Sequence, residues 1–285
     1  MVILFALLAA LSNAVSVITQ HIASTADSRR DSGWRLVRYL FRNPLWLLGW
    51  VALAGAFLFQ ALALHNGQLS VVQPLLVTEL IFALLLRQFS LHQSIRPITW
   101  GGGVLTCAGL AVFLVAGEPQ GGRSTPTSQH WIVAAAGCTV ATAALAVLAQ
   151  RGSPGLRAAL YASAAAVMWA LVAVFIKTVT DTFTQFGVGG MFLHWPIYAL
   201  AVSGVAGVLL QQAALHVGPL RGSQPLLVII DPLVSIALSV WLFDEHFVPD
   251  AAILAVAAIA FAVMCIGVVL LTQTTPATMD AEIAR

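Results

Sequence analysis

Two carboxylic acids, Glu79 and Asp231, lie inside long apolar stretches of the sequence. An ionised carboxylate is costly in hydrocarbon, and intramembrane acids usually mark the path of an ion, a proton or a substrate. A protonated acid that is hydrogen-bonded between helices is the structural alternative. The two acids are therefore the first candidates for a substrate or coupling-ion site, and they are also the residues predicted to bind a metal ion.

Each acid follows one copy of a repeated stretch. Residues 63–77 and 214–228 share the pattern Ala-Leu-His-x-Gly-x-Leu-x-x-x-Gln-Pro-Leu-Leu-Val without a gap. In this register the two acids are offset by one position, so they are not strict equivalents. The repeat predicts two related halves that surround one polar site.

The repeated stretch contains paired glutamines and prolines. Proline removes a backbone donor and kinks a helix, which frees a carbonyl one turn earlier. That carbonyl and the neighbouring amide side chain could together bind a cation or a polar group. A kink that a neighbouring helix satisfies is the alternative. The residues concerned are Gln73, Gln224, Pro74 and Pro225 of the repeat, and Pro232, which directly follows Asp231.

Four further polar residues are candidates. Asn13 and Gln20 lie in the first apolar stretch, and we expect them to face the centre of the helix bundle and to join the site. His65 and His216 end the second apolar stretch of each half. A histidine there caps the helix or reaches the interface, or it serves as a ligand or proton relay.

Two other charged features have less specific interpretations. Lys177 is expected to snorkel to the outer surface. The acidic cluster Asp244, Glu245, His246 and Asp250 is expected to form a solvated outer loop, although it could also gather cations at an entrance.

Composition predicts a polytopic membrane protein. Hydrophobic residues make up 60% of the chain and charged residues only 8%, far below the usual fraction in soluble domains. Spanning a bilayer takes about 20 mainly apolar residues, and each span must be helical because lipid offers no backbone partners. The nine predicted spans are 1–22, 45–65, 69–88, 97–116, 130–149, 156–178, 193–216, 219–243 and 251–272.

The basic residues predict the orientation. When the nine spans are threaded, all Lys and Arg residues fall on one side except Arg123 and Lys177. Cytoplasmic loops carry the excess of Lys and Arg, so the N-terminus is predicted to lie outside the cell and the C-terminus in the cytoplasm. The predicted location of the chain is the cytoplasmic membrane.

The repeat predicts the domain organisation. Residues 1–116 form the first repeat of four helices, which includes an interfacial segment at 24–44, and residues 130–149 form an unpaired linker helix. Residues 156–272 form the second repeat, inverted because equivalent helices are an odd number of crossings apart, and 273–285 form a cytoplasmic tail. Inverted repeats are a common architecture of secondary transporters, whose substrate sites lie near the midplane of the bilayer.

Several function classes find no support in the sequence. It contains no Walker A loop, no His-Glu-x-x-His and no Gly-x-Ser-x-Gly, and nothing suggests nucleic acid. The three cysteines lie in apolar runs and are expected to be packing residues. We therefore expect a protein that is not an enzyme and that needs no cofactor.

The chain resembles the drug/metabolite transporter superfamily, in particular its EamA-like group. The resemblance rests on Ser12-Asn13-Ala14 with Gln20, and on the run from Val240 to Glu245, where the family has an apolar-Gly-Glu turn. Here Glu245 stands at the acid position and Asp244 replaces the glycine. The two Gln-Pro-Leu-Leu-Val runs look closest to the NIPA-like branch, which is associated with magnesium transport.

These observations predict a secondary transporter of a small solute or cation that works by alternating access, with midplane carboxylates binding a cation or a coupling proton. A NIPA-type magnesium transporter, a flippase for a lipid-linked group, and a non-transporting subunit or sensor are the alternatives. Membrane lipids and the solute are the expected partners, and the sequence leaves open whether the protein forms a homodimer.

Overall fold

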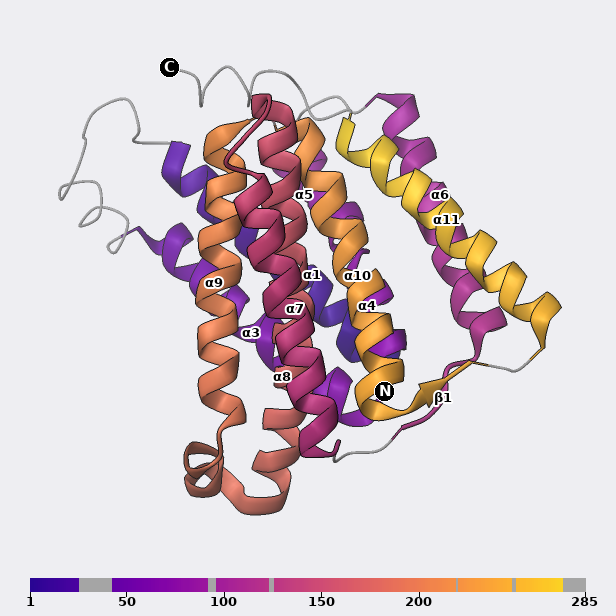
Figure 1. Ribbon diagram of the computed structural model, residues 1–285. Coiled ribbons are helices and arrows are strands. Elements are labelled where there is room, and N and C mark those ends of the chain that lie inside the picture. Colours follow the sequence, from indigo (N-terminus) through magenta and orange to yellow (C-terminus); the bar gives the residue numbers. More distant parts are fainter. Residues whose placement is uncertain (26–42, 92–95, 123–125, 219, 248–249, 274–285) are drawn as a thin grey trace. The chain divides into compact units, whose positions relative to one another are not determined.

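The computed structural model describes residues 1–25, 43–91, 96–122, 126–218, 220–247 and 250–273 (Figure 1). In this part of the chain, nine helical spans are long and apolar enough to cross a membrane. The prediction of a helical, multi-pass chain with nine spans is confirmed to that extent. Residues 26–42 of the predicted interfacial segment and residues 274–285 of the predicted tail lie outside the described residues.

The elements follow one another as helices with two very short strands. The helices are α1 (Val2–Thr25), α3 (Pro44–Asn66), α4 (Leu69–Leu76), α5 (Glu79–Leu91), α6 (Pro97–Gly117), α7 (Ser128–Leu148), α8 (Pro154–Leu193), α9 (Pro196–Val217), α10 (Leu220–Phe243) and α11 (Ala251–Gln273). The strands are β1 (Gln120–Gly121) and β2 (Glu245–His246).

Proline and capping side chains set the helix starts. Prolines occupy the first turn of α6, α8 and α9, where a missing amide donor costs nothing because that donor has no partner within the helix. The Ser153 hydroxyl accepts a hydrogen bond from the Leu156 amide, and the Asp250 carboxylate accepts one from the Ala252 amide at 2.8 Å. Both are N-caps of the kind that starts a helix.

The third predicted span is two helices rather than one. α4 ends at Leu76, and α5 begins at Glu79 after a two-residue turn. At the turn the Thr78 amide and the Thr78 hydroxyl both donate to the Leu75 carbonyl, at 3.1 and 2.7 Å. The expected continuous helix is therefore wrong here, because these shorter-range bonds replace the regular ladder just after Pro74.

The sixth span is longer than the predicted 156–178. α8 continues to Leu193 and deviates from helical geometry only at Gly187, where φ is 69° and ψ is −173°. The polar residues beyond 178 do not end the helix because their hydroxyls bond within it: Thr178, Thr180 and Thr182 each donate to the carbonyl four residues earlier, at 2.7 to 3.0 Å.

The chain forms two compact units. The first comprises Met1–Asn66 and Leu75–Ile95, and the second comprises Gly67–Pro74 and Arg96–Arg285. In the first unit α1 packs against α3 and α5. The contact with α3 is close at Gly49, where a Cβ atom would lie 2.6 Å from Cγ of Gln20.

In the second unit α8 packs against α7, α9 and α10 (Figure 1). Its middle turns are buried, and small side chains make this possible: Ala162, Ala164, Ala165 and Ala166 are at most 1% exposed. Small residues let neighbouring helix backbones approach closely in a membrane. α8 is therefore the central helix of this unit.

α6 and α11 form an antiparallel pair in the second unit, and glycines bring their backbones together. A Cβ atom on Gly109 of α6 would lie 2.5 Å from the Met264 nitrogen and 2.6 Å from the Ala260 oxygen. A Cβ atom on Gly267 of α11 would lie 2.5 Å from the Thr106 nitrogen. Neither position has room for any side chain.

The two short strands correct the expectation of an entirely helical chain. β1 and β2 pair antiparallel, with Gln120 opposite His246 and Gly121 opposite Glu245. Gly121 has φ of 75°, and a Cβ atom there would lie 2.3 Å from the His246 ring. The pairing fixes the backbone that carries Glu245.

Candidate functional site

Two of the residues predicted to form the site meet in the first unit. Asn13 of α1 donates a hydrogen bond from Nδ2 to Oε2 of Glu79, and both residues are half-buried. Glu79 is the first residue of α5, so its carboxylate lies where the free amides and the dipole of a helix favour negative charge. Gln20, about two turns further along α1, instead donates to the Ser16 hydroxyl at 3.1 Å.

Asp231 belongs to the second unit. It is half-buried in α10, and its Oδ1 accepts a hydrogen bond from the buried Ser235 hydroxyl at 3.2 Å. Pro225 and Pro232 lie inside α10, which continues across both. The repeat therefore differs between its copies: the first has a helix break before its acid, and the second has an unbroken helix.

The paired glutamines also differ. Gln73 is 4% exposed, and its Nε2 has no hydrogen-bond partner among the residues that the structure describes, whereas Gln224 is exposed. A buried amide with an unused donor is rare in proteins and points to a bound polar group or water. His65 and His216 are exposed in the last turns of α3 and α9, as the helix-end interpretation expects.

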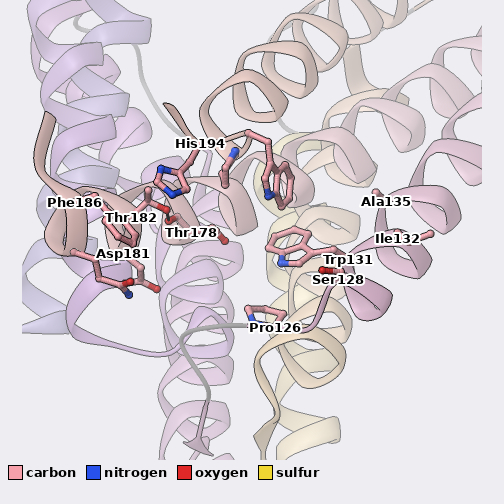
Figure 2. Close-up of a pocket in the computed structure, with 13 residues that line it drawn as sticks. Pro126, Ser128, Trp131, Ile132, Ala135, Thr178, Asp181, Thr182, Phe186 and His194 are labelled. Carbon is pink, nitrogen blue, oxygen red and sulfur yellow. Dashed lines mark hydrogen bonds between the residues drawn. The ribbon is translucent and has the colours of Figure 1, made fainter. Parts of the chain in front are cut away.

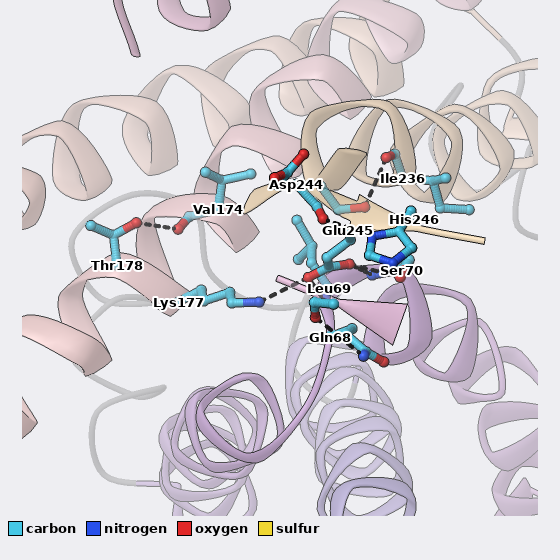
Figure 3. Close-up of polar contacts among 12 residues, drawn as sticks. Gln68, Leu69, Ser70, Val174, Lys177, Thr178, Ile236, Asp244, Glu245 and His246 are labelled. Atoms are coloured by element: carbon cyan, nitrogen blue, oxygen red, sulfur yellow. Dashed lines mark hydrogen bonds and ion pairs between the residues drawn. The ribbon is translucent and has the colours of Figure 1, made fainter. Parts of the chain in front are cut away.

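The second unit contains a buried ion pair that further hydrogen bonds surround (Figure 3). Lys177 Nζ of α8 lies 2.9 Å from Oε1 of Glu245. The same carboxylate accepts hydrogen bonds from the Leu69 amide at 2.9 Å, the Ser70 amide at 3.0 Å and the Ser70 hydroxyl at 2.7 Å. Glu245 thus caps the N-terminus of α4 from a distant part of the chain.

This cluster overturns two predictions. Lys177 is 9% exposed and Glu245 is 1% exposed, so the lysine does not snorkel and this acid is not in a solvated loop. Both side chains can be buried because their opposite charges compensate each other. The Lys177 ammonium also lies 4.5 Å from the centre of the Phe243 ring, which attracts a cation. Two features of the sequence pointed to this pair: Lys177 is a lone lysine in an apolar run, and Glu245 stands at the acid position of the motif that the chain resembles.

The surroundings of Glu245 keep it ionised. Burial alone would raise the pKa of its carboxyl, but the Lys177 charge and the hydrogen bonds from Lys177 and Ser70 outweigh burial, and the pKa lies below its ordinary value. The Glu245 carboxylate is therefore ionised at neutral pH.

The backbone at Asp244 has a conformation that glycine adopts easily. Asp244 follows the last residue of α10 and has φ of 58°, in the left-handed region that side chains with a branched Cβ avoid. Aspartate tolerates that conformation better than most residues, and glycine adopts it freely.

Replacing Asp244 with Val should therefore destabilise the fold by about 1–2 kcal/mol, whereas replacing it with Gly should be tolerated. Thermal unfolding of the two purified variants in the same detergent compares them directly. A Val variant as stable as the Gly variant would contradict the proposed role of backbone conformation.

Metal ligands do not gather in the described residues: none of them form a group of three or more His, Cys, Asp or Glu side chains. Glu79 and Asp231, the predicted metal ligands, belong to different units.

Comparison with known proteins finds similarity along nearly the whole chain, to a protein whose activity is not given. No protein-family model matches the sequence. An uncharacterized protein from Corynebacterium glutamicum is 29% identical over 287 residues, which cover 99% of this chain and 98% of that protein. No solved structure matches.

Proposed function

We propose that this protein is a secondary transporter that moves a small solute or cation across the cytoplasmic membrane by alternating access. The observation that carries the proposal is Glu79, which begins a half-helix inside an apolar span and is held there by Asn13. We further propose that Glu79 binds the coupling proton or cation.

A broken helix with an acid at the break is a feature that transporter sites use. Interrupted membrane helices offer free backbone groups and a helix terminus to an ion or a polar substrate near the midplane. The Glu79 carboxylate can bind either the Asn13 amide or a proton or cation, so the hydrogen bond between α1 and α5 differs between the empty and the occupied site. The exchange would bias one conformation over another.

Packing around the helices supports the proposed inverted repeat. In the first unit the first helix packs against the second and third spans, α3 and α5; in the second unit α8 packs against the second and third spans of its own half, α9 and α10. The α6–α11 contact is also reciprocal: Gly109 meets residues 260 and 264, and Gly267 meets residues 102 and 106, which are the equivalents of 260 and 264 in the repeat.

The proposal includes the drug/metabolite transporter superfamily as the family and an outside N-terminus with a cytoplasmic C-terminus as the orientation. The first rests on the resemblance of the motifs around Asn13 and Glu245, and the second on the distribution of Lys and Arg.

Replacing Glu79 with Gln should reduce uptake into proteoliposomes to the level of protein-free liposomes, because a neutral amide can neither release a proton nor attract a cation. The measurement is a screen of labelled metabolites and monovalent and divalent ions, with and without a pH gradient. It is carried out first with the unmodified chain and then with the variant on each solute that moves.

The matched control is Glu118→Gln, the same change at an exposed acid in the connector after α6. It should transport like the unmodified chain. Transport that survives Glu79→Gln unchanged, or a screen in which no solute moves, would count against the proposal.

A further inference from the structure

The second unit contains a cavity of about 500 Å³ (Figure 2). Its walls come from the first turns of α7, from α8 between Thr178 and Phe186, and from the turn between α8 and α9. Among the described residues that line it, none belongs to the predicted transport site. The volume lies within the usual range of small-molecule sites, so this cavity is a separate candidate for ligand binding.

One wall of the cavity is aromatic and held in place. The Trp131 ring stacks on Phe175 at 5.3 Å between centroids, and the Trp195 ring meets Trp131 edge-on at 5.1 Å. Trp131 is 8% exposed, whereas Trp195 is 51% exposed. Two packed rings thus fix an accessible ring beside the cavity, and a wall that is already fixed lowers the entropy cost of binding.

The opposite wall depends on the break in α8. At Gly187 the backbone adopts φ of 69° and ψ of −173°, a conformation that is essentially restricted to glycine. Beyond the break the His194 ring stacks on Phe186 at 4.7 Å, and His194 Nδ1 lies 2.7 Å from the Gly190 carbonyl oxygen. Figure 2 shows Phe186 and His194 on the side of the cavity opposite Trp131.

The contact with Gly190 determines which nitrogen of His194 carries a proton. A carbonyl oxygen can only accept a hydrogen bond, so Nδ1 must be the donor. In the neutral imidazole the other ring nitrogen, Nε2, is then unprotonated and is an acceptor. Within the described part of the chain, the ring makes its hydrogen bond through Nδ1 alone, so Nε2 is available to a ligand.

Two threonines that line the cavity have also used their donors. The Thr178 hydroxyl donates to the Val174 carbonyl at 3.0 Å, and the Thr182 hydroxyl donates to the Thr178 carbonyl at 2.8 Å. Each hydroxyl oxygen can still accept a hydrogen bond. Asp181 also lines the cavity, but it already has an interaction partner and is not needed for this match. The wall near His194 therefore suits a ligand that supplies a hydrogen-bond donor.

We propose that this cavity binds a small aromatic molecule that carries a hydroxyl or N–H group, such as a phenol or an indole. The accessible rings of Trp195 and Phe186 contact the ligand ring, because aromatic pairs gain energy beyond the area that they bury. His194 Nε2 accepts the hydrogen bond from the ligand and fixes its orientation, as a few polar groups do in a mainly apolar pocket. The proposal concerns binding and stands apart from the proposed transport.

The test measures binding to the purified full chain in detergent by equilibrium dialysis, with protein-free micelles of the same detergent as the blank. Two pairs of probes differ in whether they carry the donor: indole with 1-methylindole, and phenol with anisole. We expect saturable binding of indole and of phenol, each several-fold tighter than its methylated partner, because each methylated probe lacks one hydrogen bond. This comparison needs no variant.

Two variants then test the two walls. His194→Phe keeps a ring that can stack on Phe186 but removes the acceptor. It should abolish the preference for indole, while 1-methylindole binds within about twofold of its affinity for the unmodified chain. Trp195→Leu should weaken both probes several-fold. The matched control is Trp50→Leu, which removes a tryptophan of nearly equal exposure (50%) from the first unit and should leave binding unchanged.

Four results would each overturn the proposal. The first is equal affinity for indole and 1-methylindole, and for phenol and anisole, in the unmodified chain. The second is a preference for indole that survives His194→Phe, or an equal loss of both probes in that variant, because the acceptor would then not be the cause. The third is a Trp195→Leu variant that binds no more weakly than Trp50→Leu. The fourth is the lack of saturable indole and phenol binding up to about 10 mM.

Discussion

Replacing Lys177 with Met is expected to lower the free energy of unfolding by about 3–5 kcal/mol, because the buried Glu245 carboxylate would keep its charge and lose its counter-charge. Met has a similar length and preserves the apolar packing of the lysine stem. The hydrogen bonds from Leu69 and Ser70 remain, but they cannot neutralise the acid. Thermal unfolding in detergent should show a loss of about 10 °C.

A double variant separates the charge from the packing. Lys177→Met combined with Glu245→Gln removes both charges and should be more stable than Lys177→Met alone, since no uncompensated ion remains. Arg151→Met, at an exposed position in the connector before α8, is the control for removing a positive charge and should change little. A double variant that melts below Lys177→Met alone would rule out charge compensation as the cause.

The same pair makes stability depend on acid pH. The folded pKa of Glu245 lies below its ordinary value, so its contribution is complete above the unfolded pKa of about 4.3 and is lost as the pH falls through the lower folded pKa. The difference in melting temperature between the unmodified chain and Glu245→Gln should therefore be constant near neutral pH and shrink below about pH 4.

Replacing Gly109 with Leu should push α6 and α11 apart and lower the free energy of unfolding by at least about 1–3 kcal/mol. The atoms that a side chain would strike belong to the backbone of Ala260 and Met264, which cannot rotate away. Gly267→Leu should have a comparable effect, because it faces the α6 backbone in the same way.

Gly101 offers a matched control in the same helix. It is exposed, and a Cβ atom there would have no neighbour within 4 Å. Gly101→Leu should therefore melt within about a degree or two of the unmodified chain. Helix propensity favours Leu over Gly at both positions, so equal losses at Gly101 and Gly109 would contradict the role of the close α6–α11 contact.

The sequence predicted the nine spans because length and apolar composition are local properties, and lipid leaves helices as the available structure. It also selected Asn13 and Glu79, which the structure brings into hydrogen-bonding contact. Polar residues are so rare in these runs that each one is informative. That they meet depends on how α1 and α5 pack, which spacing along the chain does not specify.

The Lys177–Glu245 pair could not be derived from local patterns. Its members are 68 residues apart, and the amides that Glu245 caps lie about 175 residues earlier. A lone lysine near the end of an apolar span is equally compatible with snorkelling, and an acid after a helix is usually solvated. A kink at Pro74 was predicted, but the complete break between α4 and α5 at Val77 and Thr78 was not, because neither of these residues is glycine or proline.

The length of α8 has a consequence for how the protein responds to bilayer thickness. From Pro154 to Gly187 the helix is about 50 Å long, whereas the hydrocarbon core is about 30 Å thick. The hydroxyls of the three threonines near its end are bonded within the helix, so these side chains do not need contact with water. Aromatic side chains that favour the interface surround this end, among them Phe186, Trp195 and Tyr198, each more than half exposed. We therefore expect this end of α8, with its exposed aromatic side chains, to be the part of the helix that adjusts to a thicker or thinner membrane.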